Sequence, residues 1–129
     1  MTLKIRQTVN KTHAVTLTLE GKINNETADR LDQEIQRLLR SGIRSIVLDM
    51  AGVDFVSSAG IGILLKAKAS LARSDGDVFM LNLQPQIRKA FDIMKLMPAM
   101  NVFASVQELD DYLEKVQRRI AEEGTFSDQ

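Results

Sequence analysis

The chain has 129 residues, with 17 basic and 17 acidic side chains, one histidine and no cysteine. This length predicts one domain with its own hydrophobic core, and the lack of cysteine excludes disulfide frameworks, thiolate zinc sites and cysteine nucleophiles. A single histidine, His13, excludes a metal site built from several histidines. The net charge of zero provides no overall field that would attract nucleic acid, so we expect no nucleic-acid partner.

The N-terminal segment and the short apolar runs argue against a secreted or membrane protein. Residues 1–7 alternate and lack the apolar stretch of a signal peptide. The longest apolar runs span about five residues, as at 61–65, whereas a membrane-spanning helix needs about 20. We therefore expect a cytoplasmic protein that does not insert into a membrane.

Two alternating segments open the chain and predict a hairpin. Apolar and polar residues alternate over residues 3–7 and again over residues 15–19, which is typical of strands with one buried face. The polar residues 10–12 predict the connecting turn, and Gly21 is expected to end the second strand. His13 falls beside this turn, where we expect an exposed side chain without a functional role.

A helix is predicted between Asn24 and Gly42. Asparagine is a favoured N-cap, and glycine commonly lies just beyond the last turn of a helix. The apolar positions recur at steps of three and four, which gives the helix one buried face: Ala28, Leu31, Ile35, Leu38 and Leu39.

The middle of the chain alternates strands and helices. Residues 43–50 are almost continuously apolar or β-branched, as in a strand that is buried on both faces. Residues 52–58 are predicted to form the loop after this strand, and a helix is predicted over residues 58–72. A turn over residues 74–77 then leads to another buried strand at residues 78–81.

Two more helices and a weak strand complete the chain. Pro85 suits the first turn of a helix, and residues 102–103 predict a short strand. Ser105 and Glu108 form a capping-box pattern at the start of the last helix, and residues 119–129 are expected to be its end and a frayed polar tail. The apolar face of the helix that begins with proline comprises Ile87, Ala90, Phe91 and Met94.

The resulting order of elements is β-β-α-β-α-β-α-β-α, without an internal repeat. Strands that alternate with helices favour right-handed crossovers and a largely parallel sheet. We therefore expect an α/β fold, with a mixed sheet of four or five strands, an antiparallel hairpin at its N-terminus and helices packed on the sheet.

The junction at Ser57 and Ser58 carries the main functional signal. A buried strand precedes it and a helix begins there, and ligand sites in α/β proteins gather at the carboxyl ends of strands. The N–H groups and partial positive charge of a helix N-terminus stabilise phosphate, so a serine at this point is a suitable acceptor for a kinase. The structural alternative is a helix N-cap that contributes about 1 kcal/mol.

Other chemistry is disfavoured at this junction. Gly60 and Gly62 lack the third glycine of a dinucleotide site, and the chain contains no Gly-Lys-Ser/Thr of a P-loop. A serine hydrolase needs a glycine two residues before its nucleophile, where Val56 stands. No pair of carboxylates, base–nucleophile pair or metal-ligand cluster stands out, so we expect neither catalysis nor a metal site nor a cofactor.

Residues 54–62, with the sequence Asp-Phe-Val-Ser-Ser-Ala-Gly-Ile-Gly, follow the strand end at 46–49 and resemble the signature of STAS domains. This family comprises the bacterial anti-sigma factor antagonists and their relatives. Residues 19–24, before the first helix, and 85–91, at the start of the third, are similar as well. The resemblance covers nearly the whole chain and implies a STAS fold over residues 1–118.

The resemblance implies a non-enzymatic binding protein that is controlled by phosphorylation. In this family, an anti-sigma factor with a histidine-kinase-type ATPase fold binds the unphosphorylated antagonist and releases its sigma factor. The same anti-sigma factor phosphorylates a serine at the start of the second helix, which falls on Ser58 here, and the phosphorylated antagonist is then released. Ser57 is the runner-up acceptor because it also carries a hydroxyl. The second implied partner is a PP2C-type phosphatase, which restores the binding form.

The implied contact surface surrounds Ser58. It combines the loop before the first helix, the loop before the serine pair and the exposed face of the second helix: Asn24, Asn25, Asp54, Ser57, Ser58, Ile61 and Leu65. Core packing is the alternative role of Ile61. Asp49 matches a family position that holds an acid or an amide, and we expect it to anchor a loop through a hydrogen bond.

Two positions depart from the family pattern, and other family functions stay open. The best-studied antagonists carry aspartate directly before the phosphoserine, and often before the first helix, where this chain has Ser57 and Asn24. Both changes remove negative charge near the acceptor and bear on kinase recognition and partner choice. Relatives also serve as subunits of lipid-transport ABC complexes, where an ATPase subunit is bound stably, and in anion transporters and sensory assemblies. Partner switching also controls outputs other than transcription.

Overall fold

The computed structural model describes residues 3–9, 14–97, 100–105, 107–112, 114–115 and 118–119. The predicted hairpin turn at residues 10–12, His13, Pro98 and residues 120–129 lie outside the described residues. The elements follow in the order β1 (Leu3–Val9), β2 (Val15–Ile23), α1 (Asn25–Arg40), β3 (Ser45–Val56), α2 (Ser58–Ala72), β4 (Asp77–Leu81), α3 (Pro85–Ile93) and β5 (Asn101–Phe103). Residues 107–112 are helical as well. Among the described elements, no helix has both the length and the hydropathy needed to span a bilayer.

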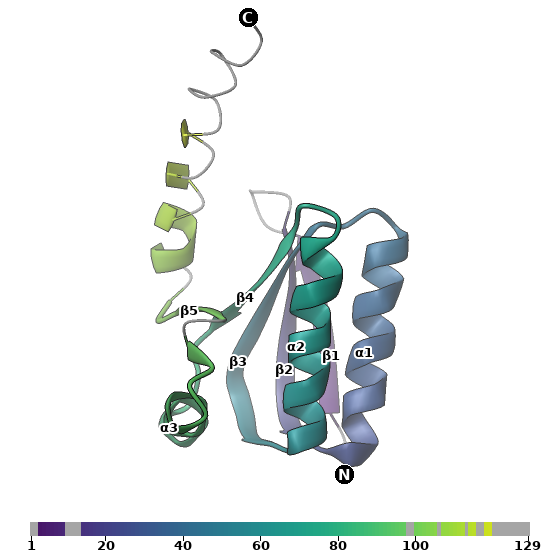
Figure 1. Ribbon diagram of the computed structural model, residues 1–129, viewed down its shortest axis with the longest axis vertical. Helices are drawn as coiled ribbons and strands as arrows, with labels where there is room; N and C mark the ends of the chain where they lie inside the picture. The colour runs from purple at the N-terminus through teal and green to yellow at the C-terminus, as the bar shows by residue number, and fades with distance from the viewer. Residues whose placement is uncertain are drawn as a thin grey trace, which may run out of the picture.

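The strands form one sheet in the order β1-β2-β3-β4-β5. β1 pairs antiparallel with β2, and the other three pairs are parallel. Each parallel pair is connected through a helix, and Figure 1 shows α1 and α2 side by side against one face of the sheet, with α3 near the β5 edge. The predicted mixed α/β sheet is therefore confirmed, with five strands rather than four.

Successive residues of the central strand β3 face two separate cores. Ile46 and Leu48 belong to the larger core with the buried sides of α1, α2 and α3, whereas Val47 belongs to a smaller cluster. Because neighbouring side chains of a strand point to opposite faces, the smaller cluster lies on the other face, where Leu109 of the C-terminal helical segment packs. The prediction of a strand buried on both faces is therefore confirmed for residues 46–48.

Strand β3 extends further than the sequence predicts. Residues 52–56 continue the strand, whereas a loop is expected there, so this prediction is wrong. β2 also runs past Gly21, its predicted end, to Ile23. The register between the two strands shifts twice, before Glu20 and after Gly21, and Gly21 adopts a φ of 122° that glycine tolerates. Such irregularities break the alternation of buried and exposed residues from which a strand is predicted.

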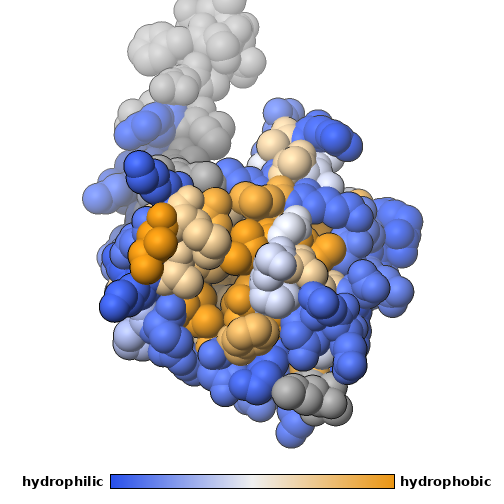
Figure 2. Space-filling model, turned by 60° about the horizontal axis from the view of Figure 1, so that its bottom comes forward, coloured by the Kyte–Doolittle hydropathy of each residue, from blue (hydrophilic) through white to orange (hydrophobic). Residues whose placement is uncertain are grey.

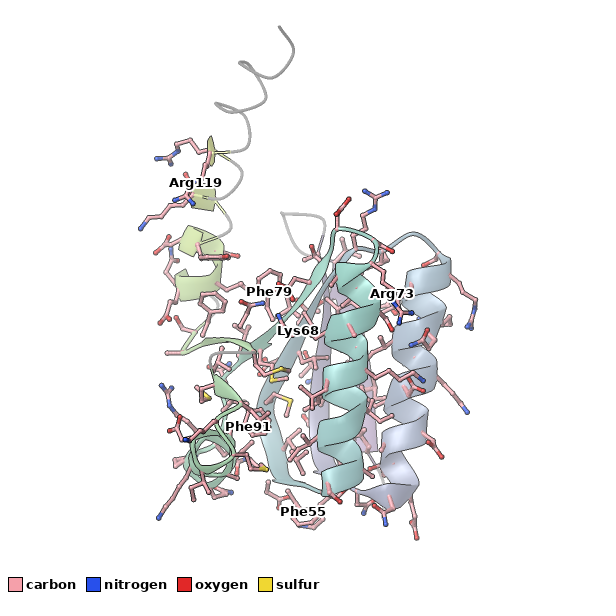
Figure 3. All side chains as sticks on the ribbon, viewed as in Figure 1. Phe55, Lys68, Arg73, Phe79, Phe91 and Arg119 are labelled. Carbon is pink, nitrogen blue, oxygen red and sulfur yellow. The ribbon has the colours of Figure 1, made fainter. Side chains whose placement is uncertain are left out.

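The apolar face predicted for α3 is only partly buried. Ile87 and Phe91 are buried, and Figure 3 shows Phe91 between α3 and the sheet. Met94 is 44% exposed, which contradicts the prediction. The helix ends at Ile93 and Lys95 turns the chain with a φ of 58°, so Met94 does not continue the helical face.

Candidate functional site

The parallel strands β2 and β3 end next to each other, and each leads directly into a helix. The backbone N–H of Ser57 donates to the carbonyl oxygen of Ile23 at 2.8 Å, which ties the two strand ends together. α1 begins at Asn25 and α2 at Ser58, so both helix N-termini open at the same end of the sheet, at the bottom of Figure 1. The N–H groups that helices leave unpaired at their N-termini therefore gather at this end.

Asn24 caps α1, as the sequence predicts. Its Oδ1 accepts hydrogen bonds from the N–H groups of Glu26 and Thr27, at 3.0 and 3.1 Å. Thr27 is buried and completes the motif, because its Oγ1 accepts from the Asn24 N–H at 2.9 Å and donates to the Lys22 carbonyl oxygen at 2.7 Å. The Asn24 side chain thus fixes the turn between β2 and α1.

Ser57 caps α2, and Ser58 does not. Ser57 Oγ accepts a hydrogen bond from the Gly60 N–H at 3.1 Å, and the Ser57 carbonyl oxygen accepts from the Ile61 N–H at 2.9 Å. Ser58 is the first residue of the helix and is exposed. Within the described part of the chain, its hydroxyl has no hydrogen-bond partner. The structural role of an N-cap therefore falls on Ser57, and the Ser58 hydroxyl is left accessible.

Gly60 brings the first turn of α2 close to both strand ends. A Cβ atom at this position would lie 2.7 Å from Ile23 Cγ2 and 2.9 Å from Val56 Cγ1, which is closer than packed side chains allow. A Cβ atom on Gly62 would have no atom within 4 Å. Of these two glycines, Gly60 is therefore the one that the packing of α2 requires.

A pocket of about 330 Å³ lies where the two helix N-termini meet. Its lining joins the start of α1 to the end of β3 and comprises Asn24, Asn25, Glu26, Phe55 and Ser57. The structure thus brings Asn24, Asn25 and Ser57, three of the residues expected at the site, to one place. Ser58 follows directly at the start of α2.

An ion pair and an exposed aromatic ring stand at the end of β3. Lys22 Nζ donates to Asp54 Oδ1 at 3.1 Å and lies 5.8 Å from the centre of the Phe55 ring. The side chains of the pair are 38% and 54% exposed, so we expect the pair to contribute about 1 kcal/mol or less. Phe55 is 45% exposed and projects below the ends of β3 and α2 (Figure 3). Exposed aromatic side chains are common anchors of protein–protein interfaces.

This end of the molecule has an apolar centre and a hydrophilic rim. Figure 2 views it from this side and shows hydrophobic residues gathered in the middle of the face, with hydrophilic residues around them. The large exposed apolar side chains on β3, α2 and α3 are Phe55, Leu65 and Ile93, together with Met94 just after α3. Such an apolar patch with a polar rim is typical of a surface that binds another protein.

Two of the residues expected at the partner surface, Ile61 and Leu65, lie on α2. Leu65 lies two helical turns after Ser58 on the same side of the helix and is 38% exposed. Ile61 is half-buried and packs against the core. Leu65 is thus available to a partner, whereas Ile61 contributes to both the core and the surface.

Asp49 stands apart from the pocket. It lies within β3, seven residues before the strand ends at Val56. Its Oδ1 accepts hydrogen bonds from the Ala51 N–H at 3.1 Å and from Asn82 Nδ2 at 3.3 Å, which links β3 to the segment after β4. Asp49 does not line the pocket with Ser57.

The described residues provide no metal centre. No group of three or more acidic or histidine side chains among them is arranged to hold a metal ion. Asp54 is paired with Lys22, and Glu26 lies in the first turn of α1, where the helix dipole favours an acid. The arrangement therefore offers a hydroxyl, helix N–H groups and an apolar surface.

Sequence reasoning missed Lys22, Glu26 and Thr27 as parts of this site, whereas Phe55 lies in the segment before the serine pair that was expected at the surface. Thr27 was detectable, because it stands three residues after Asn24, at the spacing of a capping box. Lys22 was not, because its place beside Asp54 depends on the register shift between β2 and β3.

Comparison with known proteins identifies relatives of this chain. The chain is 32% identical over 75 residues to BtrV of Bordetella bronchiseptica, whose name describes a candidate anti-sigma factor antagonist. This match covers 58% of the chain and 65% of BtrV, just under two thirds of that relative. The anti-sigma F factor antagonist of Lysinibacillus sphaericus is 26% identical over 97 residues, which cover 74% of this chain and 83% of the relative.

Solved structures share the fold. SpoIIAA in its unphosphorylated form, an anti-sigma factor antagonist, matches with a TM-score of 0.73 and 21% identity, over 87% of this chain and 97% of SpoIIAA. A candidate anti-sigma factor antagonist of Thermotoga maritima matches with a TM-score of 0.80 and 15% identity, over 85% of this chain and 94% of that chain. Identities this low show a common fold and nothing further.

The family pattern matches most of the chain. The STAS domain pattern covers residues 4–109, which include all of the sheet except Leu3, helices α1 to α3 and both helix N-termini at the pocket. The resemblance carried by residues 54–62 is therefore confirmed. This chain belongs to the STAS domain family.

Proposed function

We propose that this protein is an anti-sigma factor antagonist that changes partners when Ser58 is phosphorylated. The unphosphorylated form binds a kinase anti-sigma factor, which then releases its sigma factor. The kinase transfers the γ-phosphoryl group of ATP to Ser58 Oγ, ADP leaves, and the hydroxyl proton is released. The phosphorylated protein then dissociates. We propose that it acts in the cytoplasm, as a binding protein rather than an enzyme.

The observation that carries this proposal is the position of Ser58 beside a separate cap. Ser57 holds the helix N-terminus through Gly60, while the Ser58 hydroxyl is exposed. A phosphate on Ser58 adds about −1.5 to −2 charges and three strong acceptors, next to N–H groups that favour an anion. The cap of α2 stays intact, so the fold tolerates the modification while the surface changes.

The surface around Ser58 explains why the modification would release a partner. Phe55 and Leu65 are exposed on the adjoining elements, so a partner that covers them also covers Ser58. Burying a phosphate whose charge is not fully neutralised costs several kcal/mol. A loss of 2–4 kcal/mol weakens binding about 30- to 1,000-fold. The switch is electrostatic and steric, and it requires no change of fold.

The names of relatives support an anti-sigma factor as the partner. BtrV and the Lysinibacillus sphaericus relative are named antagonists of anti-sigma factors, as is a Staphylococcus aureus relative that is 23% identical over 82 residues. We propose that the partner has a histidine-kinase-type ATPase fold and that a PP2C-type phosphatase removes the phosphate. The proposed contact residues are Asn24, Asn25, Asp54, Ser57, Ile61 and Leu65.

Affinity purification from the native host tests the proposal. The Ser58→Ala and Ser58→Glu variants serve as paired baits, and mass spectrometry identifies the retained proteins. The matched control pair is Ser74→Ala and Ser74→Glu, because Ser74 is exposed and follows the opposite end of α2. We expect the Ser58→Ala bait to retain a histidine-kinase-type ATPase that the Ser58→Glu bait loses, and both Ser74 baits to retain it.

Other outcomes contradict the proposal in distinct ways. Transporter subunits retained equally by both Ser58 baits would assign the protein to a lipid-transport complex and leave Ser58 without a switching role. A retained kinase whose further partner is not a sigma factor would support partner switching with a non-transcriptional output.

A further inference from the structure

Lys22 is held by two weak contacts beside the proposed phosphorylation site. Its ammonium donates to Asp54 at 3.1 Å and lies 5.8 Å from the centre of the Phe55 ring. Both side chains of the ion pair are exposed to solvent. An exposed pair of this kind is easily exchanged for a stronger one, so Lys22 is available to another anion.

The strand register places Lys22 next to the residues that lead into α2. Lys22 pairs with Phe55 and Ile23 pairs with Val56 in the parallel ladder, and the Ile23 carbonyl oxygen accepts from the Ser57 N–H at 2.8 Å. Phe55 and Ser57 line the same pocket. The ammonium of Lys22 therefore lies over a ring that lines the pocket together with Ser57, one residue before the acceptor.

The lysines of α2 lie at least two turns beyond Ser58 and are paired with other elements, and the pocket itself contributes an acid. The two lysines of α2 are bound to other elements: Lys66 to Asp32 of α1 at 2.9 Å, and Lys68 to Asp77 of β4 at 3.1 Å. The first turn of α2 has no acidic residue, and α1 contributes Glu26 to the pocket. Among these three described lysines, Lys22 is the one whose ammonium contacts a residue that lines the pocket.

We propose that Lys22 is the counter-cation of the phosphate on Ser58, and that it leaves Asp54 for the phosphate when Ser58 is modified. This inference rests on the proposed function only in its choice of Ser58 as acceptor. A phosphate attracts an ammonium more strongly than a single carboxylate does, because it carries about −1.5 to −2 charges at neutral pH. The long, flexible lysine stem allows the ammonium to move between the two anions.

The exchange makes the switch a two-part change of the surface. The phosphate appears at the start of α2, and the Asp54 carboxylate at the end of β3 loses its cation. Asp54 was itself expected at the partner surface, so two anionic groups then face a partner where one paired group stood before. The partner of Lys22, near the end of β2, thereby depends on whether Ser58 of α2 is phosphorylated.

The test uses phosphoserine placed at position 58 during translation, so that no kinase is required. Phosphorus-31 NMR over pH 4–9 measures the second pKa of the phosphate, which is about 6 for an unperturbed group. A nearby cation stabilises the dianion and lowers this pKa. We expect Lys22→Gln to raise it by about 0.3 to 0.7, Lys22→Arg to leave it near that of the unsubstituted protein, and Asp54→Asn to lower it.

Lys66→Gln is the matched control, because Lys66 is an exposed lysine of α2 whose partner is Asp32. An unchanged phosphate pKa in Lys22→Gln, or an equal rise in Lys66→Gln, would overturn the role of Lys22. Either result leaves the proposed function standing, because the paired Ser58 baits test that function separately.

Discussion

Ser57 Oγ accepts a hydrogen bond from the Gly60 N–H at 3.1 Å, and this contact gives two adjacent serines different roles. Ser57 closes the N-terminus of α2, whereas the exposed hydroxyl of Ser58 has no partner within the described residues. The chain thus separates the residue that stabilises the helix from the residue proposed to be modified.

The two serines should differ in their effect on stability. Ser57→Ala removes the side-chain cap and should lower the free energy of unfolding by about 1 kcal/mol. Ser58→Ala removes an exposed hydroxyl and should change it by less than about 0.5 kcal/mol. Urea denaturation followed by circular dichroism measures both values, and equal losses for the two variants would contradict the division of roles.

Substituting each of the two glycines of α2 by alanine should change the stability of the protein in opposite directions. Gly60→Ala places a Cβ atom 2.7 Å from Ile23 Cγ2, and the crowding should destabilise the protein by about 1–3 kcal/mol. Gly62→Ala meets no atom within 4 Å and should stabilise the helix by up to about 1 kcal/mol. Thermal unfolding distinguishes them, and a stabilised Gly60→Ala protein would show that α2 does not rest on the strand ends as described.

Thr27 should contribute clearly to the stability of the fold, although the sequence alone did not place it at the site. Thr27→Val keeps the shape of the side chain but removes the hydrogen bonds to the Asn24 N–H and the Lys22 carbonyl oxygen. Leaving these part-buried groups unpaired should cost about 1–3 kcal/mol. Glu26→Gln, at an exposed position of the same turn, should cost only a few tenths of a kcal/mol. Similar urea midpoints for the two variants would contradict this account.

Tyr112 should hold the C-terminal helical segment on the sheet. Its ring centre lies 5.2 Å from that of Phe103 and 6.3 Å from that of Phe79, and Leu109 is buried nearby in the same cluster as Phe79. Tyr112→Ala should therefore speed tryptic cleavage after Lys115 and leave the rest of the fold protected, as measured by mass spectrometry of timed digests. Glu108→Gln, an exposed change in the same segment away from the cleaved bond, is the control and should cleave like the unsubstituted protein.

The fold was predictable where local patterns dominate. Local apolar patterns predicted which faces are buried: the alternation in β2, the apolar stripe of α1 and the continuous apolar run of β3. Asn24 predicted the start of α1 correctly. The end of β3 was not predictable in this way. Its last residues pair with β2 only after two shifts of register, which arise from the contact between distant segments.

The candidate site was likewise predictable only where local sequence signals define it. The serine pair was visible because a strand-to-helix junction has local signals, but the sequence did not show which serine caps the helix. Lys22 joins the site only because β2 and β3 are paired up to Val56. The pocket is therefore a product of tertiary register rather than of any single motif.

The most direct test of the central claim is phosphorylation of the pure protein by the kinase that the Ser58→Ala bait retains. The two proteins are incubated with ATP and Mg²⁺, the modified residue is mapped by mass spectrometry, and the Kd of each form for the kinase is measured by calorimetry. The account predicts a single phosphate on Ser58 and a Kd that rises about 30-fold or more. A phosphate on another residue, or the same Kd for both forms, would contradict it.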